Sequence, residues 1–467
     1  MLPVTHGSLL DFPADPGACM EQLQQTHGNL ASLKDGSQQI VFVFGPEWNQ
    51  RVLTDTQTFH SRFFSIRGPR RSAQRRLTCG LLSMNGEEHR EHRRIVMQPF
   101  QRRAISGYQE ATHRLTLDLL NEWKPGQVRD MHQEMTQFML RVTSAILFGL
   151  DVPELACEVG EMLHSWVELN HVVGMGAILS DTAFTERYDE LLSLAEQLEL
   201  KVRELINFRR QAGAGGQDVL SLLIQAHDEH QAIDEDELIG HVALLFGAAH
   251  MTTAHTLAWT LFLLAQHPSV MREVDAEIHE QMAGELPTME EAARMPLIER
   301  VLKESMRVLP ASGYSQRLCD TSVTLGPLNL RRGTPVVFSQ YITHRMPELF
   351  PEPKNFQPDR WLEISPSPYA FLPFGAGPRM CLGAALSMVI LKTVVPAMFR
   401  RFRLTMVPGA RVDGRIVSTM LGPTSPVPML ISRADGCFEA MPVTGTIQQM
   451  LNLPEMPAAG TGLRRAA

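Results

Sequence analysis

The chain has 467 residues, of which 44% are hydrophobic and 20% are charged, a composition typical of globular proteins. Its formal net charge is −8 and it contains no long run of Lys or Arg, so we do not expect a nucleic-acid partner. The six cysteines follow no repeated spacing and form no CxxC pair, which argues against a disulfide framework or a zinc ribbon and indicates a reducing compartment.

The sequence shows neither an N-terminal signal peptide nor a membrane-spanning segment. The first residues, MLPVTHGSLLDFPADPG, lack the basic start and apolar run of a signal peptide. No stretch reaches the ~20 consecutive apolar residues that a membrane-spanning helix needs. We therefore expect a cytoplasmic protein without a membrane anchor.

Strand-like runs are few and short. In chain order they are QQIVFVF near residue 40, TSVTLG near 321 and TPVVFS near 334. The Gly-rich stretch AGAGGQD at 212–218 is predicted to be a loop between helices. It has neither the preceding strand nor the following Lys-Ser or Lys-Thr of a phosphate-binding loop. The rest shows helical periodicity, so the fold class is mainly α with a small β component.

The segment AIDEDELIGHVALLFGAAHMTTAHTLAWTLFLLAQHP predicts the longest helix. Asp234 and Glu237 have the spacing of a capping box, and Pro268 ends the pattern. Roughly 32 residues at ~1.5 Å each make a helix ~48 Å long, enough to cross a domain. The pattern alone favours a central core helix, with one face formed by Leu238, Val242, Leu245, Ala249, Thr252 and Thr256.

Periodicity is lost after about residue 436. We expect one domain over residues 1–435 and a loosely ordered tail over 436–467. No internal repeat is found.

The stretch FLPFGAGPRMCLG at 371–383 places a cysteine in a Gly-rich loop before an apolar helical segment. A helix N-terminus lowers the pKa of a thiol, so we expect Cys381 to be a thiolate. Gly375, Gly377 and Gly383 leave room for a large flat group to approach its sulfur. A nucleophile would need a neighbouring histidine, which the loop lacks. A metal thiolate fits better, although a single cysteine is more often structural.

The run from Phe374 to Gly383 resembles the haem-thiolate signature of the cytochrome P450 family. That resemblance implies a haem b (iron protoporphyrin IX) between the long helix and the helix that follows the cysteine loop. It implies that Cys381 is the axial iron ligand. It also implies that Phe374 shields the sulfur, that Arg379 binds a haem propionate, and that Gly375 and Gly383 belong to the cofactor site.

Three further segments carry the resemblance, in the order expected for the family. In LIERVLKESMRVLP, Glu304 and Arg307 are three residues apart, a spacing also common in exposed helical ion pairs. The stripe of apolar residues around Glu304 draws it toward the core, where a charge must be paired. The resemblance adds Arg360, in NFQPDRW, as the third member of a structural ion network.

In NGEEHREHRRIVMQPF, His89 and Arg93 share one helical face. A zinc site at His89 and His92 lacks further ligands at useful spacing, and a solvated basic face is the simpler alternative. The resemblance implies instead that His89 and Arg93 bind haem propionates, as does Arg317.

The long helix departs from the family pattern at one position. Related proteins carry a small residue, any residue, an acid and a threonine, which here are Ala249, His250, Met251 and Thr252. The resemblance implies a catalytic site at Ala249, Met251 and Thr252, with the Thr252 hydroxyl bonded to iron-bound dioxygen. Met251 has no proton to donate, and general acid–base help is worth ~10²–10⁴-fold. Ordered water, His250 or His255 could supply protons instead.

The resemblance implies a monooxygenase of secondary metabolism that oxidises a hydrophobic small molecule, terpenoid, fatty acid or steroid-like. Its substrate contacts would be Ala248, Ala249, Ser312 and Met420, with a lid at VVGMGAIL, residues 172–179. Because Met251 replaces the acid, a haem-thiolate isomerase or dehydratase and a peroxide-dependent enzyme stay open. A non-catalytic haem sensor is a further alternative.

No GxGxxG motif follows a strand, and no cysteine cluster could hold a second cofactor. Electrons are therefore expected from a separate ferredoxin and ferredoxin reductase. We expect the protein to be a monomer.

Overall fold

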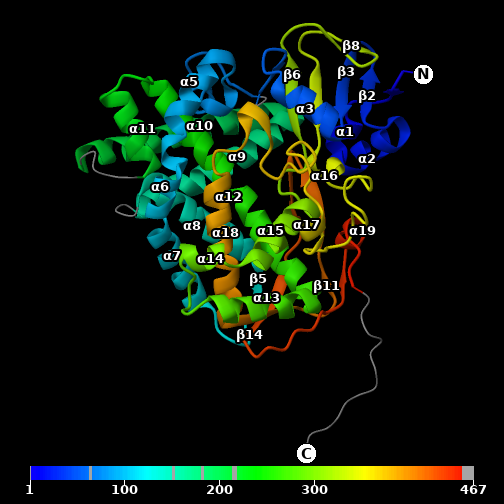
Figure 1. Cartoon of the computed structure of the whole chain (residues 1–467). Helices are drawn as coiled ribbons and strands as arrows, with labels where there is room; N and C mark the ends of the chain where they lie inside the picture. Colours follow the sequence, from blue (N-terminus) through cyan, green and yellow to red (C-terminus); the bar gives the residue numbers. More distant parts are fainter. Residues whose placement is uncertain (1, 63–65, 150–152, 180–182, 213–217, 455–467) are drawn as a thin grey trace, which may run out of the picture.

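The computed structural model describes residues 2–62, 66–149, 153–179, 183–212 and 218–454, without the side chains of 171, 174–179, 183–185 and 212. Helices form most of the chain and gather on one side, whereas the main sheet and the N-terminus lie on the other side (Figure 1). The expected mainly α class with a small β component is confirmed.

Eleven helices precede the longest one in the described part of the chain. They are α1 (Asp11–Ala14), α2 (Pro16–His27), α3 (Pro46–Thr54), α4 (Ala73–Leu77), α5 (Gly86–Val96), α6 (Arg102–Gly107), α7 (Gln109–Glu122), α8 (Met131–Phe148), α9 (Pro153–Leu179), α10 (Ala183–Ala212) and α11 (Val219–Asp228). The short 3₁₀ helices are η1 (Leu81–Ser83), η2 (Gln98–Phe100) and η3 (Gly377–Arg379). Later helices are α12 (Glu235–Gln266), α13 (Pro268–Gln281), α14 (Met289–Ala293), α15 (Pro296–Val308), α16 (Gln340–Thr343), α17 (Arg360–Glu363), α18 (Ala384–Arg401) and α19 (Ile447–Met450).

The main sheet has six strands in the order β1-β2-β3-β9-β6-β4. Their bounds are β1 (Val4–His6), β2 (Leu30–Asp35), β3 (Gln38–Val43), β9 (Pro335–Phe338), β6 (Ser315–Cys319) and β4 (Phe59–His60). The predicted strands near residues 40 and 334 are β3 and β9, which pair in parallel with Val41 opposite Val336. The predicted strand near 321 is β7 (Val323–Leu325), which pairs with β8 (Leu328–Leu330).

Smaller sheets complete the β component. One holds β10 (Phe402–Met406), β14 (Pro428–Arg433) and β5 (Val128–Asp130). Two-stranded sheets join β12 (Gly414–Val417) to β13 (Met420–Pro423), and β11 (Ala410–Arg411) to β15 (Val443–Thr444).

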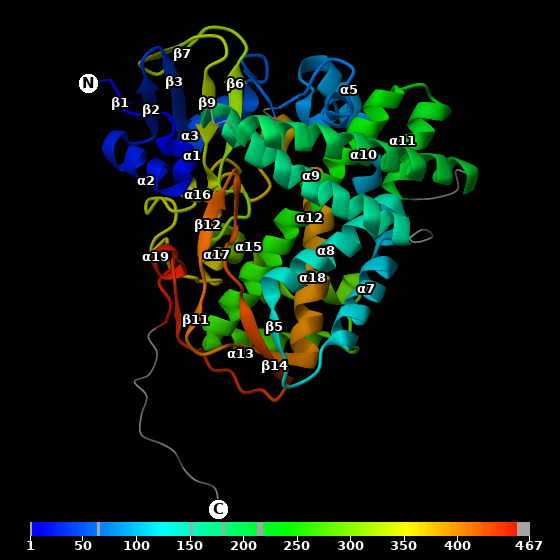
Figure 2. The same cartoon turned by 180° about the vertical axis from the view of Figure 1, so that it is seen from behind.

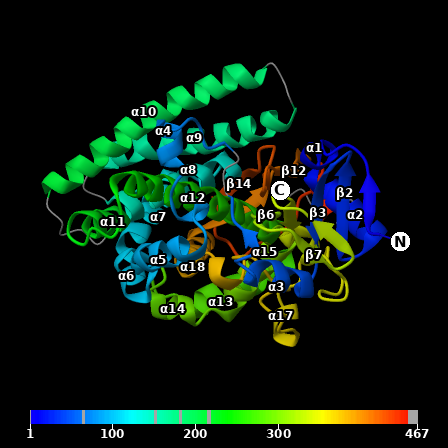
Figure 3. The same ribbon diagram turned by 90° about the horizontal axis from the view of Figure 1, so that it is seen from above.

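Helix α12 is the predicted long helix, and it spans 32 residues. Its capping box is present: Asp234 accepts from the Glu237 backbone N–H, and Glu237 accepts from the Asp234 backbone N–H, each at 2.8 Å. Figures 2 and 3 show α8 and α18 beside α12, with α9 and α10 lying along one another. Because neighbours surround it, α12 is buried on more than one face and serves as the wall of two cavities.

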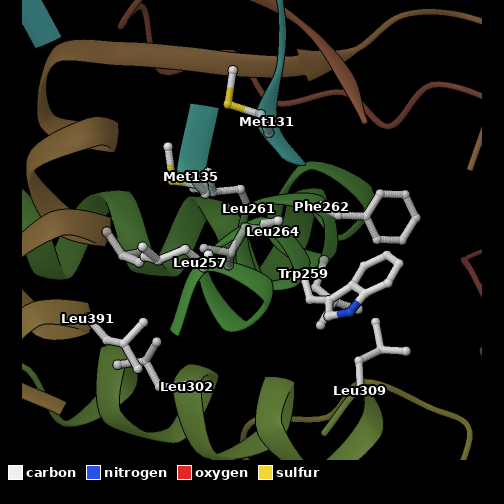
Figure 4. Close-up of a cluster of buried hydrophobic side chains, with 14 of the residues drawn as sticks. Met131, Met135, Leu257, Trp259, Leu261, Phe262, Leu264, Leu302, Leu309 and Leu391 are labelled. Atoms are coloured by element: carbon white, nitrogen blue, oxygen red, sulfur yellow. The ribbon is translucent and has the colours of Figure 1, made fainter. Parts of the chain in front are cut away.

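The C-terminal half of α12 forms the centre of the main core. Figure 4 shows its side chains packed against methionines of α8 and leucines of α15 and α18, with Leu309 just beyond α15; the labelled residues are Met131, Met135, Leu257, Trp259, Leu261, Phe262, Leu264, Leu302, Leu309 and Leu391. All are at most 2% exposed. At ~25 cal/mol per Å² of apolar surface buried, each large side chain contributes about 2 kcal/mol to the free energy of folding.

The segment beginning at residue 436 differs from the expected loose tail. Val443 lies in β15, and Ile447 and Leu451 are buried in the main core one helical turn apart. The backbone N–H of Asn452 donates to the carbonyl of Lys354 at 3.0 Å. Three apolar residues spaced four apart form too short a pattern to predict an ordered segment from sequence. Packing against the main core is what orders it. Residues 455–467 lie outside the described part.

The expected Gly-rich loop and the expected lid both lie partly outside the described residues. Residues 213–217 of the Gly-rich stretch lie outside it, whereas Asp218 caps α11 by accepting from the Ser221 backbone N–H at 2.9 Å. The expected lid at 172–179 forms the end of α9, and only its first two side chains are described. Among the helices in the described part, none is long and apolar enough to cross a membrane.

Buried histidines predict how stability depends on pH. Burial lowers the pKa of His241, His255 and His344 to about 3, and that of His250 to about 4. Above the ordinary histidine pKa of ~6.5, folded and unfolded forms are both neutral. Below it, only the unfolded chain takes up protons, so stability falls with pH until the folded pKa values are reached. We expect each histidine to cost about 2 kcal/mol at pH 5 relative to pH 7.

Urea unfolding followed by circular dichroism at pH 7, 6 and 5 measures this loss. A flat free energy of unfolding over that range would contradict the assignment of neutral, buried histidines. Replacing His344 alone should reduce the slope, because one titrating group is removed.

Candidate active site

The cysteine loop is shaped by two glycines with positive φ. Gly375 has φ 68° and Gly377 has φ 73°, values that other residues rarely adopt. A Cβ at Gly377 would lie 2.8 Å from the carbonyl oxygen of Leu53, so a side chain is also excluded by contact. The loop closes where the Cys381 backbone N–H donates to the carbonyl of Phe374 at 2.9 Å. It therefore presents Cys381 directly ahead of α18.

The thiol of Cys381 is accessible from a cavity, although protein atoms surround it on its other sides. Burial raises its pKa, while the backbone of Gly383, the charge of Arg93 and the backbone of Ala384 act in the opposite direction. The expectation of a pKa lowered by the helix N-terminus is thus wrong for the protein alone, because desolvation outweighs the helix. A bound metal cation would reverse that balance and stabilise the thiolate.

A cavity of about 1150 Å³ lies between α12 and the cysteine loop. Most residues selected from the sequence line it: His89, Arg93, Ala248, Ala249, Thr252, Ser312, Arg317, Phe374, Gly375, Arg379, Cys381 and Gly383. We call it the main cavity. These lining residues come from α5, α12, β6, the segment after α15 and the cysteine loop, which are far apart in sequence.

Four basic side chains converge on one side of the main cavity. Burial, then Arg379, Arg93 and Arg317, lower the pKa of His89 to about 4. Burial and the neighbouring Arg379 lower the pKa of Arg317 to about 10. Burial and Arg93 lower that of Arg379 to about 10. The guanidinium groups stay charged at neutral pH, so they repel one another in a desolvated place.

No carboxylate of the described residues pairs with Arg93, Arg317 or Arg379. Arg93 donates to the carbonyl of Met380 at 2.6 Å, and Arg317 to that of Gln316 at 2.9 Å. Arg379 donates to the side chain of Asn85 at 2.7 Å and to the carbonyl of Met84. Desolvated cations without counter-charges are costly, so this cluster fits a ligand carrying two or more negative charges.

Above the thiol, α12 turns a small apolar surface to the main cavity. Ala248, Ala249 and Thr252 line it, and the Thr252 hydroxyl donates to the carbonyl of Ala248 at 3.2 Å. Because the hydroxyl proton is donated within the helix, Oγ1 stays at the cavity wall with its lone pairs free to accept. Thr253 adds a second hydroxyl, 3.2 Å from that of Ser387 on α18.

Met251 faces the other way. With His250 and His255 it lines a second cavity of about 1240 Å³ on the opposite side of α12. His250 Nε2 lies 3.0 Å from His164 Nδ1, so this ring is held away from the main cavity. The histidines proposed as proton donors therefore do not reach the main cavity directly.

Met420 also lines the second cavity rather than the main one. Its expected contact with substrate is thus not provided by this structure. The same turn instead presents Ser418 and Thr419 to the main cavity, and Ser418 lines both cavities. Sequence reasoning missed both residues, because the bridge between Met420 and Ser312 sets which side chains point inward.

The structure brings Glu304, Arg307 and Arg360 together in one buried network. Glu304 is fully buried and accepts two bonds from Arg307, at 2.8 and 2.9 Å, and one from Arg360 at 2.9 Å. Its oxygens also accept from the backbone of Gln357 and the indole of Trp361, each at 3.0 Å. This carboxylate ties α15 to the segment that leads into the cysteine loop.

The comparisons with known proteins agree with this geometry. A family model described as Cytochrome P450 matches residues 4–426. The chain belongs to the cytochrome P450 family. Cyclooctat-9-en-7-ol 5-monooxygenase of Streptomyces melanosporofaciens is 31% identical over 82% of this chain and 84% of its own length. Pentalenene oxygenase of Streptomyces avermitilis is 26% identical over 85% of this chain and 89% of its own.

Solved cytochrome P450 structures share the fold. The retinoic acid bound cyanobacterial CYP120A1 superposes with a TM-score of 0.77 at 23% identity, covering 91% of this chain and 96% of that one. A cytochrome P450DA heme domain superposes with a TM-score of 0.76 at 23% identity, covering 90% and 94%. The family model and the relatives named above, rather than these structures, show that the chain is a cytochrome P450 of the oxygenase class of oxidoreductases.

The family implies a haem-thiolate cofactor, and the residues present fit one. The cavity-facing thiol of Cys381 can be an iron ligand, and the glycines of its loop leave space over the sulfur. The cluster of His89, Arg93, Arg317 and Arg379, which no carboxylate of the described residues pairs, matches the two negative charges of the haem propionates. Asn85, which sequence reasoning missed, orients Arg379; its place just before α5 was the available signal.

Proposed function

We propose that this cytochrome P450 is a monooxygenase that oxidises a hydrophobic terpenoid, using haem b. The observation that carries the proposal is the pairing, in one cavity, of an accessible thiol with a small apolar wall. Ala248, Ala249 and Ala311 leave room for a bulky hydrocarbon, and Leu244 closes one side. The names of two relatives, cyclooctat-9-en-7-ol 5-monooxygenase and pentalenene oxygenase, support a terpenoid.

Haem iron, when bound, supplies the oxygen activation, while this chain orients the substrate and handles protons. We propose that His89, Arg93, Arg317 and Arg379 hold the propionates, that Phe374 shields the Cys381 sulfur, and that Gly375 and Gly383 leave it uncovered. Thr252 Oγ1 is the hydroxyl on the cavity wall of α12, and its proton becomes available when its bond to Ala248 opens. Ala248, Ala249 and Ser312 are the proposed substrate contacts.

The proposal is tested by titrating the purified, haem-loaded ferric protein with cyclic terpenes, fatty acids and steroids while following the haem spin state. A saturable shift to high spin with terpenes, absent for fatty acids and steroids, is the expected result. A shift only with fatty acids or steroids would overturn the terpenoid assignment. No shift with any class would count against the apolar pocket as a substrate site.

A second candidate function rests on Met251. Because no carboxylate occupies that position, a peroxide-dependent oxidation, which brings its own protons, is the leading alternative. An isomerase or dehydratase would also need no reductant. Measuring product formation with hydrogen peroxide alone, with reductant plus O₂, and with neither separates the three.

Introducing an acid at Met251 is expected to raise the share of reductant that ends in product severalfold. In Met251→Asp the carboxylate would face the second cavity, and Ser418, which lines both cavities, offers a hydroxyl through which its proton could reach the main cavity. Leu140→Asp is the matched control, since Leu140 lines the same cavity from α8. Unchanged coupling in Met251→Asp, or an equal rise in Leu140→Asp, would argue against a role for position 251.

The proposed electron donors are a ferredoxin and its reductase, which would dock beside the cysteine loop. Met380 is 46% exposed there, and Arg94, Arg102 and Arg103 are exposed on α5 and α6. Exposed arginines of this kind favour an acidic partner and give association rates that fall with salt. We expect Arg102→Glu with Arg103→Glu to slow reduction at low salt, whereas Arg272→Glu, exposed on α13, should not.

We further propose a cytoplasmic monomer. All six cysteines are free in the structure, which is the usual state in a reducing compartment. Light scattering on the purified protein tests the monomer.

A further inference from the structure

Two buried histidines on α5 and α12 have hydrogen bonds that the proposed chemistry does not use. His241 of α12 is fully buried and lines the main cavity, and His92 of α5 lies beside it. Their rings meet with Nε2 of His241 3.0 Å from Nδ1 of His92. The pair therefore joins α12 to the helix that carries His89 and Arg93.

The hydrogen bonds assign the proton on each ring. The backbone N–H of Leu81 can only donate, and it lies 3.2 Å from His241 Nδ1, so that nitrogen must accept. His241 then carries its proton on Nε2 and donates to His92 Nδ1. His92 in turn carries its proton on Nε2, 3.4 Å from a carboxylate oxygen of Glu237.

The chain of bonds is anchored at its far end. The other oxygen of Glu237 accepts from the backbone N–H of Asp234 in the capping box of α12. Burial, then His92, lower the pKa of His241 to about 3. His241 therefore stays neutral near pH 7, and its accepting nitrogen stays available to Leu81.

The segment held by His241 runs from Cys79 to Asn85, and we call it the roof segment. Its backbone lies directly on α12, because a Cβ at Gly80 would collide with the carbonyl of Gly240 and a Cβ at Gly240 would lie 2.6 Å from the Gly80 nitrogen. The Cys79 thiol lies 3.1 Å from the carbonyl of Asp236. Because no side chain separates the roof segment from α12 at these glycines, the bonds of Leu81 to His241 and of Cys79 to Asp236 set how the two backbones lie against each other.

The roof segment shapes both halves of the main cavity. Leu81 and Leu82 line its wall. Met84 and Asn85 accept hydrogen bonds from Arg379, a member of the basic cluster. A shift of the segment would thus alter the apolar wall and the support of Arg379 together.

We propose that His241, oriented by His92, is a positioning residue that holds the roof segment against α12 and thereby determines which ligands the main cavity accepts. The inference deepens the proposed function and rests on it for the ligand class alone. The hydrogen bonds themselves can be tested without any ligand.

Amide hydrogen exchange in the haem-loaded protein tests the hold on the segment. In His241→Leu the Leu81 N–H loses its acceptor, and we expect exchange in the roof segment to be about tenfold faster. His241→Asn offers an oxygen near the Nδ1 position and should restore most of the protection. His267→Leu is the matched control, because His267 is a buried histidine that caps α12 and lines neither cavity.

Unchanged exchange in His241→Leu would overturn the proposal, as would equal acceleration in His267→Leu. If His241→Leu does not fold, the ¹⁵N spectrum of the histidine-labelled wild-type protein decides. A His241 tautomer protonated on Nδ1 would exclude the bond to Leu81, whereas one protonated on Nε2 would support it.

Ligand titrations test the effect on specificity. We expect the affinity ratio between a bulky and a slender terpene to change about tenfold in His241→Leu and to recover in His241→Asn. An unchanged ratio alongside faster exchange would remove the role in specificity. If no terpene binds the wild-type protein, the proposed substrate class fails, while the exchange and tautomer results still judge the hold on the segment.

Discussion

Replacing Cys381 with Ser is expected to abolish reductant-driven oxidation and to remove the spectral signature of a thiolate-ligated haem. A serine hydroxyl is a far weaker and less acidic donor than a thiol, so it would not supply the electron density that a thiolate at the proposed ligand position would give to a bound haem iron. The absorption spectrum of the reduced, carbon monoxide-bound protein measures the change directly, because its main band moves to shorter wavelength when the thiolate is lost.

Cys437→Ser is the matched control. Cys437 is also a free and exposed cysteine, but it does not line the main cavity. Its replacement should leave the spectrum unchanged. A Cys381→Ser protein that kept the wild-type spectrum would contradict the assignment of Cys381 as the iron ligand.

Replacing Glu304 with Ala is expected to lower the free energy of unfolding by about 3–5 kcal/mol. Arg307 and Arg360 would remain buried without their shared counter-charge, and the Trp361 indole would lose its acceptor. Because Glu304 also holds the segment before the cysteine loop, haem retention should fall as well. Denaturant unfolding measures the first effect, and the haem-to-protein ratio after gel filtration measures the second.

Glu299→Gln on the same helix is the comparison. Glu299 is partly exposed and pairs with Lys303 and Lys392. Partly exposed ion pairs contribute at most about 1 kcal/mol, so this variant should be close to wild type. A similar loss in both variants would mean that burial of the Glu304 network adds nothing special.

Local patterns predicted the parts of the site that lie within one segment. The capping box of α12 needs only Asp234 and Glu237, three residues apart, and it is present. The cysteine loop likewise depends on glycines with positive φ that no other residue replaces easily. Such features follow from backbone geometry and short-range hydrogen bonds, which neighbouring residues decide.

Features that depend on desolvation or on packing between distant segments could not be predicted from local sequence. The pKa of Cys381 is raised, because its desolvation outweighs the helix N-terminus that the sequence displays. Met251 and Met420 line the second cavity, because the packing of α8, α9 and the β12–β13 hairpin decides which face of α12 meets which space. The order at Ile447 and Leu451 likewise comes from a core built by distant segments.

The sequence by itself thus determined the class of the fold, the long helix, the cysteine loop and the family, because each follows from patterns within short continuous segments. Only the tertiary structure decided how the charges and hydrogen bonds close between segments. The cations Arg93, Arg317 and Arg379, which no carboxylate of the described residues pairs, come from α5, β6 and the cysteine loop. The bond from Leu81 to His241 spans 160 residues. Such contacts exist only after the chain has folded, since burial both brings the groups together and removes the water that would otherwise satisfy them.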